Sequence, residues 1–289
     1  MGNKIKFRAI WNVAISEFIK WITNPRIIIA GVLIVFIRSF AVLPMLEQAD
    51  KYGEPLNILE PFIAVGNSGM LALFLPLVFL LLISDFPIMG GNTLFFIYRT
   101  GKLNWFLGQI VFIIISIFAY IGTVLISCMF MSKGVFSTQW SNSITKFNAA
   151  FPDEAGGFVS KLLPSNLYNQ IPIINAVIGT ILLIAMYLLT LALILCIMKM
   201  LYLRAAGLFS ALTVIVLGAA SCSLKIRVMW IFPTANTLMW LHYEEILREP
   251  ITPVGNSFLY FLILIVVLII ANLFVLRNLQ FINIEQDGI

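Results

Sequence analysis

Long apolar runs separated by short polar stretches are the main pattern of this chain. A membrane-spanning helix needs about 20 mostly apolar residues, and six runs approach or reach that length, although the second is short unless it extends into flanking residues. They lie roughly at Ile27–Leu46, Met70–Ser84, Trp105–Met131, Ile173–Met198, Ala205–Leu224 and Phe258–Leu276. The pattern predicts an all-α membrane protein with six transmembrane helices.

A different pattern occupies residues 1–24. Polar residues recur at every fourth position, at Lys4, Arg8, Asn12, Ser16 and Lys20, and apolar residues fill the positions between them. A cleavable signal would instead have a continuous apolar core. The spacing predicts an amphipathic interfacial helix that lies in the headgroup plane. A docking surface for a cytoplasmic partner is compatible with that position.

Composition agrees with a membrane domain. The chain is 61% hydrophobic and only 11% charged, and its mean hydropathy is +1.02. A soluble domain would carry about 25% charged residues. We therefore treat residues 1–289 as a single transmembrane domain.

The distribution of basic residues predicts the orientation. Five Lys and Arg residues precede the first span against one acid, Glu17, whereas four acids follow that span against one base, Lys51. The positive-inside rule then puts the N-terminus in the cytoplasm, and six spans return the C-terminus to the same side. Three segments are expected to face outward: Glu47–Asn67, Lys133–Gln170 and Lys225–Asn256.

The sequence offers little chemistry of its own. Its single histidine, His242, has no partner at metal-ligand spacing, so no metal site and no catalytic residue is expected. No span except the first carries a charge near its centre, which argues against coupling to a proton or sodium gradient. A phosphate-binding loop is missing as well, because Leu103 follows Gly101-Lys102. Energy for transport would have to come from an ATPase on a separate polypeptide.

Arg38 is the one charge deep inside a predicted span. It follows Ile27 by eleven residues, about 16 Å along a helix, which puts it near the middle of a hydrocarbon core about 30 Å thick. Its side chain either snorkels outward or faces a subunit interface or water-filled pathway. Under the second interpretation it would attract an acidic or carboxylate-bearing cargo.

A short segment between the second and third spans, residues 90–104, has an unusual composition. Gly90-Gly91 comes first, Asn92 can cap a short helix that begins at Thr93, and Gly101 can end that helix. The helix would be too apolar for solvent, so it should rest in the headgroup region or insert into a groove of a partner protein. Its residues are Asn92, Thr93, Leu94, Phe95, Phe96, Ile97, Tyr98, Arg99, Thr100, Gly101 and Lys102.

These residues resemble the coupling-helix region of ABC-2 type permeases. The resemblance lies in Thr93-Leu94, Arg99-Thr100-Gly101-Lys102, Trp105 and Gly108-Gln109, and in the six-span layout with an amphipathic N-terminal helix. It implies that residues 92–102 contact an ATPase subunit, which would bind the ATP and Mg. It further implies a bacterial plasma-membrane exporter of two permease copies, identical or related, and two ATPase copies, with no nucleic-acid partner.

Cargo is the least defined part of this interpretation. The spans are rich in Phe and Met and nearly free of charge, which favours a hydrophobic or amphipathic substrate. The layout is similar to exporters of amphipathic peptides such as phenol-soluble modulins. A lipid, a drug or a haem-type molecule are alternatives, as is an accessory or sensor protein that transports nothing.

Two further expectations concern packing. Residues 225–256 should form short external helices, one of them running from Pro233 to just before Pro250. The resemblance to ABC-2 permeases implies that these helices cap the pathway, and the alternative is a loop that rests on the bilayer. Small residues in the fifth span, including Gly207, Ala211 and Gly218, would allow close helix contact, either within the chain or between two copies.

Overall fold

The computed structural model describes residues 5–69, 71–88, 97–224, 226–244 and 250–278. About 79% of the chain is helical, and the described residues contain no strand. The helical class predicted from the sequence is therefore confirmed.

Five helices are long and apolar enough to cross a membrane. The first is the continuous helix Pro25–Tyr52, built from a short 3₁₀ turn, α2 (Ile28–Ile37), the π-turn η2 (Arg38–Val42) and α3 (Leu43–Tyr52). The others are α7 (Lys102–Ser132), α12 (Ile173–Met200), α13 (Arg204–Ser223) and α15 (Val254–Asn278).

The predicted second span has a different form, and six complete spans are not confirmed. Its helix, α5 (Leu71–Leu82), has only 12 residues, or about 18 Å of helix. A separate helix, α4 (Glu60–Asn67), precedes it, and the backbone is extended at Ser68 between the two. All eight residues of α4 are buried, although they belong to a segment expected outside the membrane. The chain thus enters the bundle as a broken helix.

Hydrogen bonds to Asn67 satisfy the polar groups at this break. Its amide nitrogen donates to Thr180 Oγ1 of α12 at 2.8 Å, and its Oδ1 accepts from the Met239 backbone N–H at 2.9 Å. Its backbone carbonyl oxygen, at the end of α4, accepts from Trp240 Nε1 at 2.7 Å. An unpaired backbone group in this apolar surrounding would cost several kcal/mol.

Met239 and Trp240 reach Asn67 because residues 233–242 fold back into the protein. They form α14 (Pro233–Thr237) and the 3₁₀ turn η5 (Met239–His242), and all five residues of α14 are buried. The expected single helix from Pro233 is therefore wrong. This part of the segment does not rest on the bilayer, because Leu241 and His242 are buried within the chain. The expected end of that helix, residues 245–249, lies outside the described residues.

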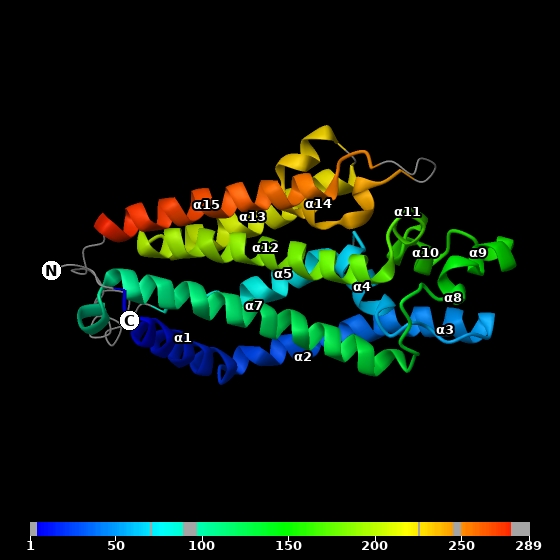
Figure 1. Cartoon of the computed structure of the whole chain (residues 1–289), viewed down its shortest axis with the longest axis horizontal. Coiled ribbons are helices and arrows are strands. Elements are labelled where there is room, and N and C mark those ends of the chain that lie inside the picture. The colour runs from blue at the N-terminus through cyan, green and yellow to red at the C-terminus, as the bar shows by residue number, and fades with distance from the viewer. Residues whose placement is uncertain (1–4, 70, 89–96, 225, 245–249, 279–289) are drawn as a thin grey trace.

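The helices form an elongated bundle with two distinct ends (Figure 1). We call the end that holds the starts of α1 (Phe7–Ile22), α7 and α13 the basic end, because the elements there carry nine described Lys and Arg residues and two acids. The bases are Lys6, Arg8, Lys20, Arg26, Arg99, Lys102, Lys199, Arg204 and Arg277, and the acids are Glu17 and Asp85.

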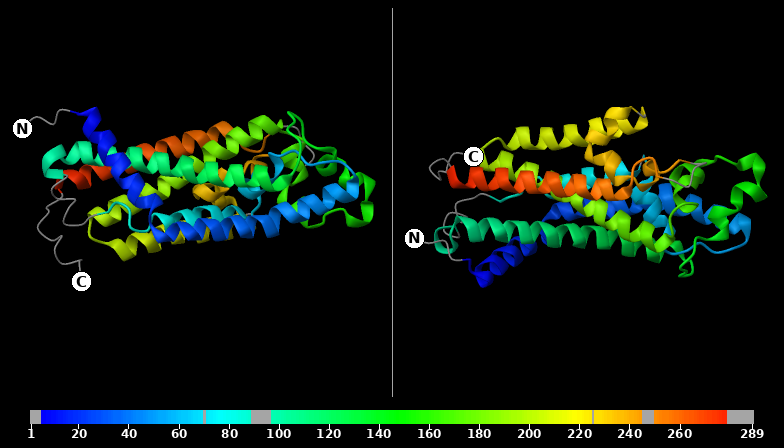
Figure 2. Two further views of the ribbon diagram at one scale, coloured as in Figure 1. Left: turned by 90° about the horizontal axis from the view of Figure 1, so that it is seen from below. Right: turned by 45° about the horizontal axis from the view of Figure 1, so that its top comes forward.

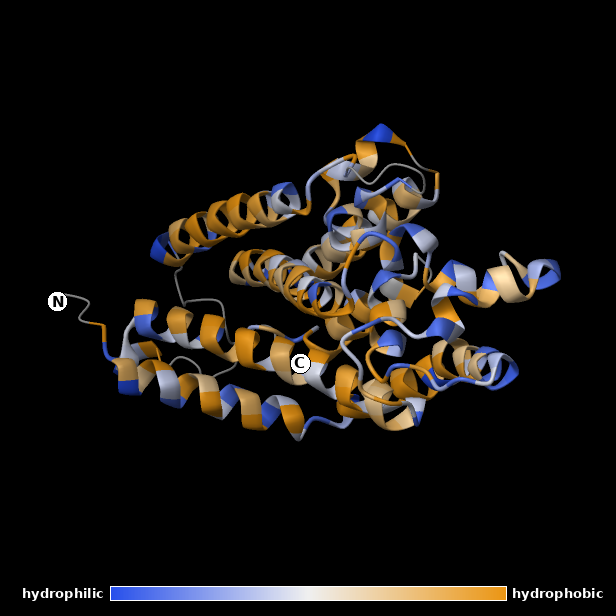
Figure 3. Ribbon diagram, turned by 45° about the vertical axis from the view of Figure 1, so that its right-hand side comes forward, coloured by the Kyte–Doolittle hydropathy of each residue, from blue (hydrophilic) through white to orange (hydrophobic). Residues whose placement is uncertain are grey.

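The other end, which we call the capped end, is covered by short helices. Its elements carry seven described acids against five bases. Polar residues gather toward both ends, whereas the long helices are mostly apolar (Figure 3). The cap consists of α8 (Asn142–Thr145), α9 (Phe147–Ala150), η3 (Pro152–Glu154), α10 (Phe158–Leu162), α11 (Ser165–Tyr168) and η4 (Arg227–Ile231).

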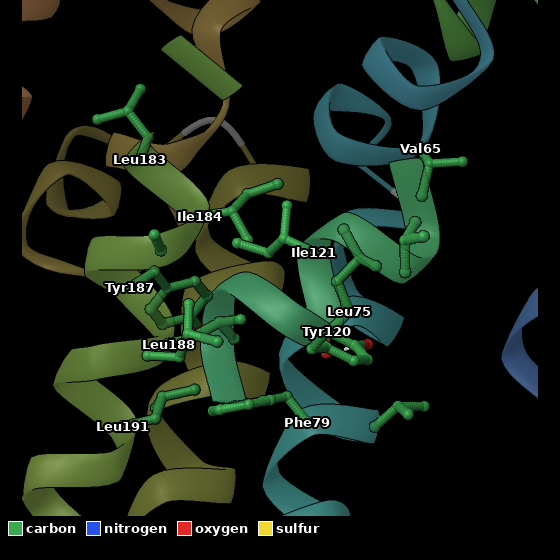
Figure 4. Close-up of a cluster of buried hydrophobic side chains, with 14 of the residues drawn as sticks. Val65, Leu75, Phe79, Tyr120, Ile121, Leu183, Ile184, Tyr187, Leu188 and Leu191 are labelled. Carbon is green, nitrogen blue, oxygen red and sulfur yellow. Dashed lines mark hydrogen bonds between the residues drawn. The ribbon is translucent and has the colours of Figure 1, made fainter. Parts of the chain in front are cut away.

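The core lies where α12 packs against α4, α5 and α7. Figure 4 shows Phe79 pointing toward the leucines of α12, Tyr120 beside Leu75, and Ile121 beside Ile184. Tyr120 is buried, and its hydroxyl donates to the Leu75 carbonyl oxygen at 2.9 Å, one residue before the proline inside α5. Burial of side chains of this size stabilises the contact by about 1.5–3 kcal/mol each.

The small residues of α13 serve contacts within the chain. A Cβ atom at Gly207 would lie 2.9 Å from Met198 Cβ, and one at Gly218 would lie 2.3 Å from Thr234 Oγ1. Ala211 between them is fully buried. Of the two expectations for these residues, the structure supports packing within one subunit.

The broken helix gives a first prediction. Asn67→Leu should lower thermal stability, because the Met239 N–H loses its acceptor and Thr180 Oγ1 loses its donor, at a cost of about 1–3 kcal/mol. The measurement is the melting temperature in detergent. Asn12→Leu, at an exposed position of α1, is the control. Equal melting temperatures for the two variants would contradict a structural role for Asn67.

Candidate functional site

The described part of the predicted coupling segment, residues 97–104, lies at the basic end and includes the start of α7. Asn92, Thr93, Leu94, Phe95 and Phe96 are outside the described residues. Residues 97–100 are helical; Ile97 is buried, whereas the Tyr98 side chain is 95% exposed and Arg99 is exposed as well. An uncovered aromatic ring beside a positive charge is typical of a protein contact surface.

Gly101 ends this short helix and allows α7 to begin in a new direction. Its N–H donates to the Ile97 carbonyl oxygen at 2.8 Å, and its own carbonyl oxygen accepts from the Trp105 N–H at 3.1 Å. Its φ of +84° lies in the region that favours glycine. The expected helix stop at Gly101 is present.

The chain enters this segment through an ion-pair cluster centred on Asp85. One carboxylate oxygen pairs with Arg26 at the start of the first span, and the other pairs with Arg204 at the start of α13. Lys199, near the end of α12, donates to the Asp85 carbonyl oxygen, and Arg26 also donates to Ser84 Oγ at 2.8 Å. Asp85, which follows α5, thereby joins the ends of three long helices: the first span, α12 and α13.

These ion pairs fix the relative positions of the helix ends more than they add to the free energy of unfolding. The Asp85 side chain is 33% exposed, and those of Arg26 and Arg204 are 40% and 59% exposed. Pairs this accessible contribute roughly 0.2–1 kcal/mol each. The cluster therefore holds the chain at Asp85, seven residues before Asn92, through ion pairs that are individually easy to break.

On the other side of the segment, Asn104 on the first turn of α7 provides a second attachment. Its Nδ2 donates to the Thr100 carbonyl oxygen at 2.7 Å, and its Oδ1 accepts from the Lys6 backbone N–H at 3.1 Å. Asn104 is buried. One side chain thus connects the end of the short helix, the start of α7 and the start of α1.

The amphipathic helix α1 packs obliquely against α7 (Figure 2). The closest approach is at Gly108, where an added Cβ would lie 2.7 Å from Val13 Cβ and 3.0 Å from the Ile10 carbonyl oxygen. The buried face of α1 comprises Ile10, Val13, Ala14, Glu17 and Trp21. The expected helix is present, but it rests on α7 and not on lipid alone.

The rest of α1 keeps two exposed stripes. One is apolar and the other is polar, with both repeating about every fourth residue, so the helix can still contact a membrane surface while it is attached to α7. The apolar stripe contains Phe7, Trp11, Ile15, Ile19 and Ile22, and the polar one contains Arg8, Asn12 and Lys20.

Arg38 begins the π-turn of the first span. Pro44 explains this turn: it has no N–H to donate to Phe40, and its ring would clash with that carbonyl group. The helix widens instead, and the Leu43 N–H donates to the Arg38 carbonyl oxygen. Single π-turns within α-helices frequently occur at functional positions.

The Arg38 side chain points away from the bundle of this single chain. It is exposed, together with Val35 and Phe40, and none of the described residues forms an ion pair with it. Helical Cβ atoms tilt toward the helix N-terminus, which for this span is at the basic end. By the predicted span limits, Arg38 is farther from the membrane boundary at that end than from the one at the capped end. Snorkelling to the nearer boundary would run against that tilt. This geometry favours a polar contact outside the single chain.

The structure brings some of the predicted site residues together and separates others. The end of the coupling segment meets α1 and α7, whereas Arg38 lies twelve residues, or about 18 Å of helix, beyond Arg26 of the Asp85 cluster. The sequence interpretation missed the bridging roles of Asp85 and Asn104. The signal for Asp85 was the set of basic residues at neighbouring span ends.

Comparison with protein-family models, curated proteins and solved structures finds no match for this chain. Within the described residues, no group of three or more His, Cys, Asp or Glu side chains could hold a metal ion.

The contact between α1 and α7 can be tested with two glycines of one helix. Gly108→Ala should displace α1, because the new methyl group would overlap Val13. Protease cleavage around residues 23–24 should then accelerate. Gly122→Ala is the control, since open space surrounds Gly122 and alanine favours a helix by up to ~1 kcal/mol. Similar cleavage of both variants would show that α1 does not depend on this approach.

Proposed function

We propose that this chain is the membrane subunit of an ATP-driven exporter of the ABC-2 type, with residues 92–102 docking on a separate ATPase subunit. Two copies of the permease, or this chain and a related one, would form the pathway together with two ATPases. The cargo would be hydrophobic or amphipathic, and a peptide is our best candidate.

One observation carries this proposal: the chain is attached to the long helices both before and after residues 92–102. Asp85 connects the chain before them to α13, α12 and the first span, and Asn104 connects the chain after them to α1 and α7. A force applied to the exposed Tyr98 would therefore reach most of the bundle. An energy-transmitting element needs this mechanical arrangement.

Charge supports the orientation that the proposal requires. The basic end carries a large excess of Lys and Arg, and the capped end a small excess of acids. By the positive-inside rule, this difference supports a cytoplasmic position for the basic end, on the same side as ATP. Both described chain ends, the start of α1 and the end of α15, lie there (Figure 1).

A non-transporting accessory or sensor protein is the main alternative. Such a protein would have no need for an exposed aromatic residue on a short helix that is anchored at both ends. The cargo assignment depends on the apolar spans and on Arg38, and lipid, drug or haem-type cargo would fit the same apolar surface.

The docking surface can be tested by photocrosslinking in the native cell. A benzoylphenylalanine placed at Tyr98 should capture an ATPase that contains a phosphate-binding loop, identified by mass spectrometry. The control is the same replacement of Phe130, which is 82% exposed near the opposite end of α7. An ATPase adduct at Phe130 but not at Tyr98, or no ATPase adduct at either position, would contradict the proposal.

The role of Arg38 can be tested with two substitutions, glutamine to remove the charge and lysine to keep the charge and change the shape. If it contacts the cargo or lines a pathway, Arg38→Gln should reduce export by about tenfold, the effect of losing ~1.4 kcal/mol, and ATPase binding should be normal. If it only snorkels, glutamine and lysine should both preserve export. The measurement is cargo export from cells with matched protein levels, and full export by Arg38→Gln would remove Arg38 from the pathway.

A further inference from the structure

An open cleft at the capped end is separate from every residue discussed for energy coupling. It has a volume of about 430 Å³ and lies between α3 and the short helices α9 and α10. One wall is a stripe of α3 that includes Glu47, Gln48 and Lys51, and the other includes Phe147, Glu154 and Phe158. Clefts of this size accept small ligands or a few side chains of a larger one.

Hydrogen bonds and ion pairs fix the two walls relative to each other. Gln48 Nε2 donates to the Ser143 carbonyl oxygen at 2.7 Å, and Lys51 pairs with Glu154. Beyond the cleft, Asn142 Nδ2 donates to Glu54 at 2.9 Å. The cleft is therefore present before any ligand binds, which reduces the entropy lost on binding.

The charge of the cleft is incompletely balanced. Lys51 is paired with Glu154, and its ammonium group also lies 5.3 Å from the centre of the Phe151 ring. Glu47 is exposed and has no hydrogen-bond or ion-pair partner among the described residues. The lining thus keeps one unpaired carboxylate, which attracts cations.

The same cleft offers apolar surface to a ligand. Both Phe147 and Phe158 line it; Phe147 is buried, whereas Phe158 is 43% exposed. A cleft lined by both an aromatic ring and an unpaired carboxylate suits an ammonium or guanidinium group, which can bind through charge and through the ring. A neutral hydrophobic ligand would leave Glu47 unpaired, and an anion would be repelled.

We propose that this cleft binds a cationic amphipathic peptide, with a lysine or arginine side chain at Glu47 and a neighbouring apolar side chain against Phe158. The assignment does not depend on the proposed ATP-driven transport, because it rests only on the geometry and charge of the capped end.

The test is direct binding to the full chain in nanodiscs of zwitterionic lipid. The probe is a fluorescent amphipathic peptide of leucine and lysine, measured by anisotropy at ~0.15 M ionic strength, and empty nanodiscs give the lipid background. Glu47→Gln and Phe158→Ala should each weaken binding by about fivefold, as expected for a partly exposed contact of ~1 kcal/mol. A peptide of leucine and glutamate should not bind above background.

Asp50→Asn is the matched control for Glu47→Gln. Asp50 is exposed on the same helix, outside the cleft lining, and the substitution removes the same charge. Unchanged binding by Asp50→Asn together with weaker binding by Glu47→Gln supports the site. Equal effects of the two substitutions would show that only the general charge of the capped end matters, and no effect of Glu47→Gln would overturn the proposal. Glu47 is exposed, so its variant should fold, as a normal gel-filtration profile would verify.

Discussion

The constraint on which this structure depends is that backbone polar groups in an apolar surrounding must find partners within the protein. Long helices satisfy it without help. Where the chain departs from a regular helix, as at Ser68, other groups must supply the missing hydrogen bonds. Asn67 does so by linking α4 to α12 and to η5. The buried segment 233–242 therefore supplies hydrogen bonds that stabilise the broken helix in this bundle.

The same constraint separates what the sequence could predict from what it could not. The five long helices follow from local hydropathy alone, and Gly101 follows from a local helix-stop pattern. The break at Ser68 could not be predicted, because the partners of Asn67 lie far away in sequence, at Thr180 and Met239. The short run 70–84 was its only visible sign. The burial of Leu241 was missed for the same reason.

The candidate site shows a similar division. Exposure of Tyr98 agrees with a local interpretation of residues 92–102 as a contact surface, although five of those residues lie outside the described part. The role of Asp85 depends on three bases that are distant in sequence and meet at one place. Span ends that share a membrane boundary can bring such residues together, but sequence spacing does not specify which residues meet. The π-turn at Arg38 had a local sign in Pro44, whose missing N–H disturbs the preceding turn.

The two attachments of the coupling segment differ in strength, and this difference bears on how it could move. The Asp85 cluster is partly exposed, so each ion pair is weak and exchangeable with water. The Asn104 attachment is buried, and Gly108 next to it allows α1 and α7 to pack at close range. Under the proposed function, a displaced segment would release Asp85 first and would carry α1 and α7 with it. Helices α1 and α7 would then move relative to α12 and α13. The pathway surface near Arg38 would shift with the first span, which begins near Arg26.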